Sequence, residues 1–195
     1  MWLGAGNPWF ATFLISLLPV IELRGAIPFG VDGNLWGDTA LGYWQAFGVA
    51  LLGNVLVAAV ILAILVPAFN WLRRFKFFRK FVEFFEERFQ NKANKTQVKK
   101  LLFIFVFCAV PLPLTGVWTA AGIAAFMKLG YLKSLIAISL GAAVSGVLMV
   151  GITVLFGAAA LSIFYFFCFA AIAVLAVIFT TAILKKTKEK SINND

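Results

Sequence analysis

Glu22 and Arg24 are the only charged residues inside the apolar stretches of this 195-residue chain. If those stretches lie in a membrane, each charge costs at least ~2.5 to 3.5 kcal/mol by insertion scales, so it faces a cavity, pairs with another charge or contacts a substrate. The planar guanidinium of Arg24 can hold a phosphate or carboxylate with two hydrogen bonds, and Glu22 can accept a proton. The alternative is an internal ion pair that pins the local fold, or a pair that reaches the membrane surface.

A second group of polar residues surrounds two closely spaced prolines. Pro111 and Pro113 lie in an otherwise apolar stretch, and each removes an amide donor and so breaks a continuous helix. The ends of broken helices offer unpaired amides and a positive dipole end, which attract anions. We therefore expect Arg24 to bind an anionic group together with free amides around three residues: Gly25, Thr115 and Gly116.

Three further residues have both a functional and a structural interpretation, and two have a structural one only. Trp118 and Thr119 could add stacking and polar contacts to the anionic group, although threonine hydroxyls in such segments also satisfy carbonyls of the broken backbone. Asn54, in the middle of an apolar stretch, is expected to form an interhelical hydrogen bond rather than a ligand contact. The spacing of Gly141 and Ser145 is typical of close helix packing, so we interpret both as architecture.

Long apolar runs dominate the chain that carries these residues. Hydrophobic residues make up 63% of it and charged residues 13%, about half the charged share of an ordinary soluble domain. No charged residue occurs in four runs, 1–21, 39–72, 101–127 and 134–184. Each run reaches the ~20 residues that cross a hydrocarbon core, and the last can cross twice. The sequence predicts an all-α integral membrane protein with a single membrane domain, whose first stretch lacks the basic n-region of a secretory signal.

Basic residues give the chain a net charge of +9. Ten of the seventeen lie between Arg73 and Lys100 and four between Lys185 and Lys190, each group next to an apolar run. This is the pattern of cytoplasmic loops that contact anionic lipid head groups, so we do not expect nucleic acid as a partner. The chain has no histidine and only two distant cysteines, so we expect no metal site, no haem and no other cofactor.

A parity argument gives the membrane topology. The basic segments 71–100 and 185–195 should both be cytoplasmic. Three apolar stretches lie between them, 101–127, 134–156 and 160–184, and three full crossings would leave the tail on the wrong side. The conflict disappears if 101–127, broken by its prolines, enters the membrane and returns to its own side as a re-entrant hairpin.

The opening stretch 9–31 has the same character, because Pro19 interrupts it. The linker 32–43 holds two acidic residues and no basic residue, so we expect it outside, and 44–70 then crosses inward. Residues 9–31 would then be a second re-entrant hairpin, opposed to the first. The chain would consist of two copies of one unit, a hairpin followed by a crossing helix, as in the inverted repeats of secondary transporters, with 160–184 as a third crossing.

Within 71–100, aromatic residues such as Phe75, Phe78 and Phe85 recur at helical spacing while most charges fall on another face. This pattern predicts one amphipathic helix in the membrane interface, followed by a polar linker. We expect it to act as an anchor, with lipid sensing or a homodimer contact as alternatives.

Four motifs occur in order along the chain: Pro-x-x-Glu-Leu-Arg-Gly-Ala-Ile-Pro at 19–28, Leu-Gly-Asn at 52–54, Phe-Gln-Asn-Lys at 89–92 and Pro-Leu-Pro-Leu-Thr-Gly-Val-Trp-Thr at 111–119. With these motifs the chain resembles the prokaryotic family named putative small multidrug export proteins, a relative of the DedA and VTT-domain membrane proteins. The resemblance implies two facing re-entrant hairpins. It points to six matching positions: Glu22, Arg24, Pro28, Pro113, Thr115 and Gly116.

Together, the resemblance and the polar residues favour a transporter of the prokaryotic plasma membrane with a cytoplasmic C-terminus. The expected partners are membrane lipids, protons acting through Glu22, and an amphipathic substrate. That substrate is a lipid-linked phosphate, as the association of DedA relatives with lipid movement implies, or a lipophilic compound; Arg24 disfavours a cation.

Two other classes of protein remain as alternatives. One is a membrane phosphatase for prenyl diphosphates, although the chain lacks histidine, the usual acid or base near neutral pH. The other is a nonenzymatic assembly or scaffold factor that docks through the aromatic helix.

Overall fold

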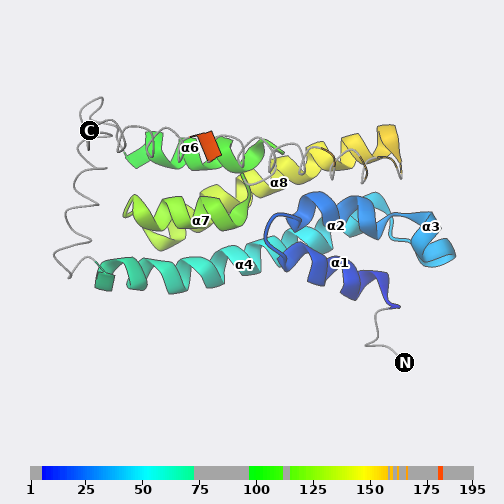
Figure 1. Ribbon diagram of the computed structural model, residues 1–195, viewed down its shortest axis with the longest axis horizontal. Coiled ribbons are helices and arrows are strands. Elements are labelled where there is room, and N and C mark those ends of the chain that lie inside the picture. Colours follow the sequence, from blue (N-terminus) through cyan, green and yellow to red (C-terminus); the bar gives the residue numbers. More distant parts are fainter. Residues whose placement is uncertain are drawn as a thin grey trace, which may run out of the picture.

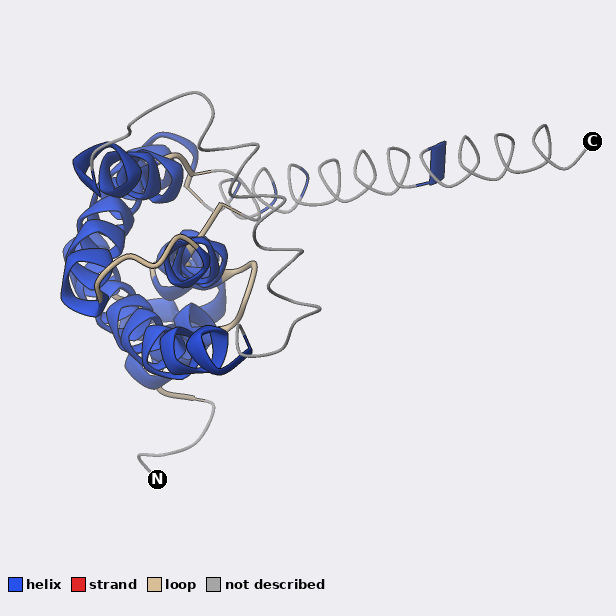
Figure 2. Cartoon of the chain, turned by 90° about the vertical axis from the view of Figure 1, so that its left-hand side faces the viewer, coloured by secondary structure: helices blue, strands red, loops and turns tan. Residues whose placement is uncertain are grey.

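The computed structural model describes residues 6–72, 97–111 and 115–157, with the single positions 159, 162, 166, 180 and 181. The described residues are mainly helical and none lies in a strand, which confirms the all-α prediction for them (Figures 1 and 2). Most of the predicted helix in 71–100, the predicted crossing 160–184 and the tail lie outside the described residues. The elements are α1 (Pro8–Leu17), α2 (Glu22–Gly30), α3 (Gly33–Trp36), η1 (Gly37–Thr39), α4 (Tyr43–Leu72), α6 (Gln97–Ala109), α7 (Val117–Phe126) and α8 (Tyr131–Phe156).

Two long helices, α4 and α8, run along the long axis in opposite directions and pack against each other (Figure 1). They have 30 and 26 residues, so at 1.5 Å per residue they are about 45 and 39 Å long, more than the ~30 Å of a hydrocarbon core. Both contain a segment that is long and apolar enough to cross a membrane, Tyr43–Phe69 and Tyr131–Phe156. These segments coincide with the predicted crossings 44–70 and 134–156.

A pair of short helices precedes each long helix. α1 and α2 run from one end of the molecule to its middle and back, and α6 and α7 do the same from the opposite end (Figure 1). The four helices have 10, 9, 13 and 10 residues, or about 14 to 20 Å each, so none equals the thickness of a hydrocarbon core. The two stretches predicted as hairpins, 9–31 and 101–127, are therefore broken helices whose turns meet near the middle.

The turn between α1 and α2 is conformationally strained. Val20 and Glu22 have φ angles of 75° and 50°, in the left-handed region that β-branched residues such as valine rarely adopt. Such residues persist where surrounding contacts hold them, and they cluster at functional sites. In the second hairpin the chain leaves α6 at Ala109 and re-enters a helix at Val117, on either side of Pro111. Residues 112–114, including the predicted site residue Pro113, lie outside the described residues.

Glycines allow each hairpin to approach the long helix that follows it. At Gly53 of α4, a Cβ atom would overlap the Ser16 hydroxyl of α1. At Gly141 of α8, a Cβ atom would lie 2.6 Å from the Phe105 carbonyl oxygen and 2.8 Å from the Cβ of Cys108, both on α6. Each half of the molecule thus packs its first short helix closely against its long helix at a glycine.

The outer faces of the long helices are apolar. Large aliphatic side chains are exposed at steps of four residues on α4 (Leu52, Leu56, Val60, Ile64) and on α8 (Leu132, Ile136, Leu140, Val144). Continuous apolar stripes of this kind suit contact with lipid, because in water they would drive association.

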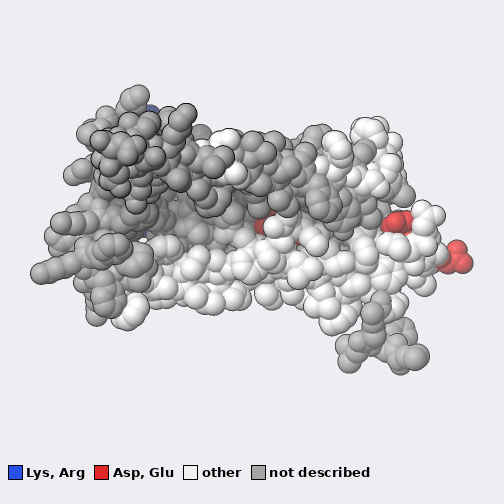
Figure 3. Space-filling view, viewed as in Figure 1, with Lys and Arg blue, Asp and Glu red and all other residues white. Residues whose placement is uncertain are grey.

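Charges gather at the two ends of the molecule. On the face shown in Figure 3, the described atoms are mostly uncharged, most of the visible acidic atoms lie at the end where α3 and η1 are found, and a small acidic patch is visible near the middle. Asp32 and Asp38 belong to these elements. At the opposite end, Lys133 Nζ on α8 donates a hydrogen bond of 3.4 Å to Gln97 Oε1 at the start of α6. The molecule therefore has an acidic end and a basic end on either side of its apolar belt.

Candidate functional site

The buried charges lie where the two hairpins meet. Glu22 and Arg24, at the start of α2, are 4% and 2% exposed. Around them, Leu23 of α2 and Val117 of α7 belong to one hydrophobic core that also contains residues of α4 and α8. Charged side chains are almost never fully buried without partners, so the contacts of these two residues decide what the site can do.

The Glu22 carboxylate binds the N-terminus of α7, in the other half of the molecule. Its Oε2 accepts a hydrogen bond of 3.1 Å from the Val117 amide, and its Oε1 accepts one of 3.4 Å from the Trp118 amide. The first amides of a helix have no partners inside the helix, and the helix dipole makes this end positive. The carboxylate therefore occupies an anion site formed by backbone, and Glu22 serves as the N-terminal cap of a helix 95 residues away in sequence.

Gly116 makes this approach possible. A Cβ atom built at Gly116 would overlap the carboxylate atoms of Glu22. Any other residue at this position would push the carboxylate away from the α7 amides or shift the start of the helix. The glycine is thus required because a side chain from the opposite hairpin packs against it. Its backbone conformation does not require glycine, since its φ of −84° is one that any residue can adopt.

Arg24 binds the other side of the same break. Its Nε donates to Ser145 Oγ on α8 at 3.3 Å. Its Nη2 donates to three backbone carbonyls of the second hairpin, those of Cys108 at 3.3 Å, Val110 at 3.2 Å and Thr115 at 3.3 Å. The last carbonyls of a helix lack intrahelical partners and form its negative end, so the guanidinium compensates the C-terminus of α6.

The two charges therefore sit on helix ends of opposite sign. Glu22 lies on the positive end of α7 and Arg24 on the negative end of α6, and both side chains come from the first hairpin. Each hydrogen bond to a charged group contributes about 1.5–3 kcal/mol, and removal of one partner of a buried pair costs about 3–5 kcal/mol. The interaction holds the turns of the two hairpins together in the middle of the molecule.

The structure corrects the expectation of a free amide at Gly25. The Gly25 amide donates to the Ile21 carbonyl at 3.0 Å, so it is not free. The amides at the start of α7 point to a carboxylate, which is an anion supplied by the chain itself. The sequence could indicate an anion site at this break, but it could not indicate that Glu22 is the occupant.

The two threonines of the break bond to its backbone. Thr115 Oγ1 donates to the Val110 carbonyl and Thr119 Oγ1 to the Gly116 carbonyl, both at 3.0 Å. These contacts fit the structural alternative given for threonines in broken segments. Trp118 is 39% exposed on α7, and Pro111 is partly buried beside the break.

For two residues, Ser145 and Asn54, the structure differs from the role predicted from the sequence. Ser145, predicted to be architectural, is a direct partner of Arg24. Asn54, predicted to form an interhelical hydrogen bond, is 1% exposed, and neither polar atom of its side chain has a hydrogen-bond partner among the residues that the structure describes. The prediction for Asn54 is wrong within the described residues, because no polar group of a neighbouring described helix forms a hydrogen bond with its side chain. The spacing of small residues on α8 indicates that another element packs closely at Ser145, but it does not indicate that the side chain in contact is Arg24.

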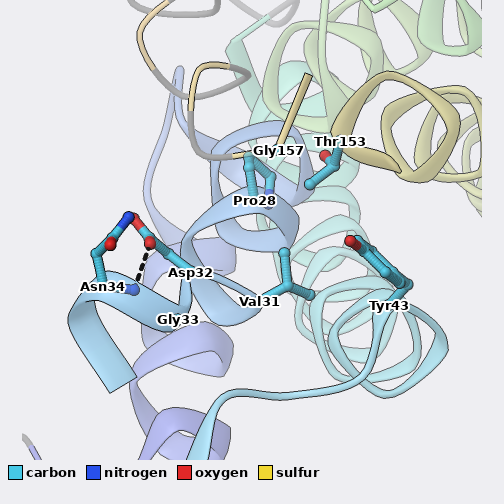
Figure 4. A pocket seen from close by; sticks show the side chains of 8 residues that line it. All are labelled: Pro28, Val31, Asp32, Gly33, Asn34, Tyr43, Thr153 and Gly157. Carbon is cyan, nitrogen blue, oxygen red and sulfur yellow. Dashed lines mark hydrogen bonds between the residues drawn. The ribbon is translucent and has the colours of Figure 1, made fainter. Parts of the chain in front are cut away.

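A separate recess of about 210 Å³ opens at the acidic end (Figure 4). The predicted site residue Pro28 lines it, so the structure places Pro28 outside the contacts of Glu22 and Arg24. Asp32 Oδ1 accepts a hydrogen bond of 2.9 Å from the Asn34 amide at its rim. The described residues contain no group of three or more His, Cys, Asp or Glu side chains that could hold a metal ion. The lining residues are Pro28, Val31, Asp32, Gly33, Asn34, Tyr43, Thr153 and Gly157.

One family model matches the part of the chain that contains both buried charges, the break before α7 and most of α8. The match to the family described as "Putative small multi-drug export protein" covers residues 22–148, from Glu22 to just beyond Ser145. No curated protein and no solved structure matches the chain. The family name indicates a transporter rather than an enzyme, and together with the two long apolar helices it indicates a membrane protein. Because the match spans more than half of its length, the chain belongs to the family of putative small multi-drug export proteins.

Proposed function

We propose that this protein moves an amphipathic substrate across or between the leaflets of the prokaryotic plasma membrane, with the two hairpins as re-entrant elements. The lengths of the short helices support this placement. A pair of helices of 13 and 10 residues is too short to cross ~30 Å, but two such pairs meeting at their turns cover the thickness from both sides. The basic end then faces the cytoplasm, together with the C-terminus, and the acidic end faces outward.

The observation that carries the proposal is the carboxylate of Glu22 on the α7 amides. Broken helices that present their positive ends to an anion near the midplane are typical of substrate sites in secondary transporters. Here the anion is an ionised side chain that can be neutralised by a proton. A protonated carboxyl group accepts weaker hydrogen bonds than a carboxylate, so proton uptake by Glu22 loosens its hold on α7.

The released amides of Val117 and Trp118 then donate hydrogen bonds to the anionic group of the substrate in place of Glu22, and Arg24 lies on the other side of the same helix break. Loss of the Glu22 contact also removes a link between the hairpins, which frees them to rearrange. Proton uptake and substrate binding are thus coupled because both act on the same helix end. A lipid-linked phosphate fits this exchange best, and a lipophilic compound is the second candidate.

The test is transport by purified protein in liposomes, with a short-chain fluorescent polyprenyl phosphate and the lipophilic cation tetraphenylphosphonium assayed in parallel. We expect movement of the phosphate above the rate in protein-free liposomes, accelerated by a proton gradient. No movement of either substrate under any gradient would contradict the proposal. Release of inorganic phosphate from a prenyl diphosphate would instead identify an enzyme.

A further inference from the structure

Asn54 is a buried amide without a hydrogen-bond partner in the part of the chain that the structure describes. It is 1% exposed, and both Oδ1 and Nδ2 lack a partner. Buried polar groups in proteins are nearly always hydrogen-bonded, because an unpaired one costs stability. A leucine has nearly the same size and would avoid this cost. The amide therefore needs an explanation other than packing.

Asn54 lies at the level where the two hairpins meet. Gly30 of α2 packs beside Ala46 of α4, because a Cβ atom built on Gly30 would lie 3.4 Å from the Cβ atom of Ala46. The two helices run in opposite directions (Figure 1). Eight residues back along α2 lead to Glu22, and eight residues forward along α4 lead to Asn54. Both steps are a rise of about 12 Å, which places the two residues within about one helical turn of the same level.

Asn54 also lies on the face of α4 that packs against the hairpins. Ala50 and Ala58, four residues before and after it, share this face. Both belong to the hydrophobic core that contains Leu23 of α2 and Val117 of α7. The unpaired amide thus lies on a face of α4 whose neighbouring residues belong to the same core as the first hairpin and α7, the helix whose amides bind Glu22.

A primary amide offers a donor and an acceptor side by side. A singly protonated phosphate matches it, because it presents an anionic oxygen and a hydroxyl on one phosphorus atom. Burial in a membrane favours the less charged form of the phosphate, and so favours this match. A quaternary phosphonium or ammonium ion has neither a donor nor an acceptor, and gains nothing from the amide.

We propose that Asn54 binds the phosphate group of the substrate, with Nδ2 donating to a phosphate oxygen and Oδ1 accepting from the phosphate hydroxyl. The inference rests on the proposed transport function and narrows its substrate to a phosphate. Arg24 and the α7 amides attract the negative charge, and Asn54 recognises the pattern of donor and acceptor that distinguishes a phosphate from other amphipathic anions and from cations.

The variant Asn54→Leu tests this role, because it removes the amide and should not impair folding. Wild type and variant are reconstituted in liposomes and given fluorescent short-chain polyprenyl phosphate, inorganic phosphate or tetraphenylphosphonium. We expect the variant to move polyprenyl phosphate at least ten-fold more slowly than wild type, with an unfolding temperature equal to or above that of wild type. A ten-fold loss confined to inorganic phosphate would identify the free ion as the ligand, and any tetraphenylphosphonium flux should be unchanged.

Ser134→Ala is the matched control. The Ser134 hydroxyl is also fully buried and unpaired, but it lies eleven residues before Ser145 on α8, or about 16 Å along the helix. This variant should transport phosphate like wild type, and an equal loss in both variants would overturn the role of Asn54. Phosphate transport by Asn54→Leu at the wild-type rate would overturn it and leave the transport proposal standing. Wild-type protein that moves only the cation would exclude the phosphate ligand, whereas wild-type protein that moves none of the three would contradict the transport proposal itself.

Discussion

The carboxylate of Glu22 lies so close to Gly116 that it fills the space a side chain would need there. The two residues come from opposite hairpins, and the contact allows the carboxylate to reach the Val117 amide at 3.1 Å. A glycine and an acid far apart in the sequence thus form a single structural unit, and each depends on the other.

Gly116→Ala should destabilise the protein. The added methyl group collides with the Glu22 carboxylate, and overpacking of this kind costs about 1–3 kcal/mol. The matched control is Gly122→Ala on the same helix, where an added Cβ meets nothing within 4 Å. That change should be neutral or stabilising by up to about 1 kcal/mol, because alanine favours a helix interior. Thermal unfolding of both variants in detergent measures the difference, and equal stabilities would contradict the contact.

Glu22→Gln should separate the structural role of Glu22 from its proton-carrying role. The carboxamide oxygen can still accept a hydrogen bond from the Val117 amide, so the variant should insert and remain monodisperse. It cannot carry a charge or exchange a proton, so substrate transport should fall at least ten-fold and lose its dependence on the proton gradient. Asp32→Asn, at the rim of the recess, is the control and should transport normally. Wild-type transport by Glu22→Gln would rule out proton coupling through this residue.

Arg24→Lys tests the geometry of the guanidinium rather than its charge. A lysine keeps the positive charge but cannot reach Ser145 and the end of α6 at once, because it lacks the planar fork. We expect a loss of at least about 1.5–3 kcal/mol, the contribution of one hydrogen bond to a charged group. Ser145→Ala removes only the contact to Nε and should cost less. We expect Arg24→Lys to unfold at the lowest temperature, Ser145→Ala at a higher one and wild type at the highest. The reverse order of the two variants would contradict the contacts assigned to the Arg24 guanidinium.

Much of the fold could be predicted from where charges and prolines are absent or present. The charge-free runs give the long helices α4 and α8, and Pro19 and Pro111 give the breaks. The partners of the buried charges could not be predicted, because a sequence does not say which helix ends meet in space. The sequence identifies Glu22 as a buried charge that needs a partner, yet its position on the α7 amides depends on a tertiary contact. The same holds for Ser145, whose polar role arises only when α8 crosses Arg24.

The close packing of the hairpins on the long helices gives a paired prediction. Gly53→Ala and Gly141→Ala should each destabilise the protein, because the added methyl group meets Ser16 in the first case and the backbone of α6 in the second. Gly48→Ala and Gly151→Ala, on the same two helices, add a Cβ with nothing within 4 Å and should have little effect. Thermal unfolding measures the difference, and equal stabilities of the two members of a pair would contradict the close packing at Gly53 or Gly141.

In the proposed topology, the two hairpins enter the membrane from opposite faces and turn back in its middle. Four single-cysteine variants test it, in a chain in which Cys108 and Cys168 are replaced by alanine. Asn7→Cys and Asn34→Cys flank the first hairpin, and Gln97→Cys and Lys128→Cys flank the second.

Labelling of intact cells or oriented vesicles with a membrane-impermeant maleimide is the most direct measurement. We expect the thiols introduced at positions 7 and 34 to react from the outside, and those introduced at positions 97 and 128 to react only from the cytoplasmic side. Reaction of the thiols at positions 97 and 128 from opposite sides of the membrane would contradict it.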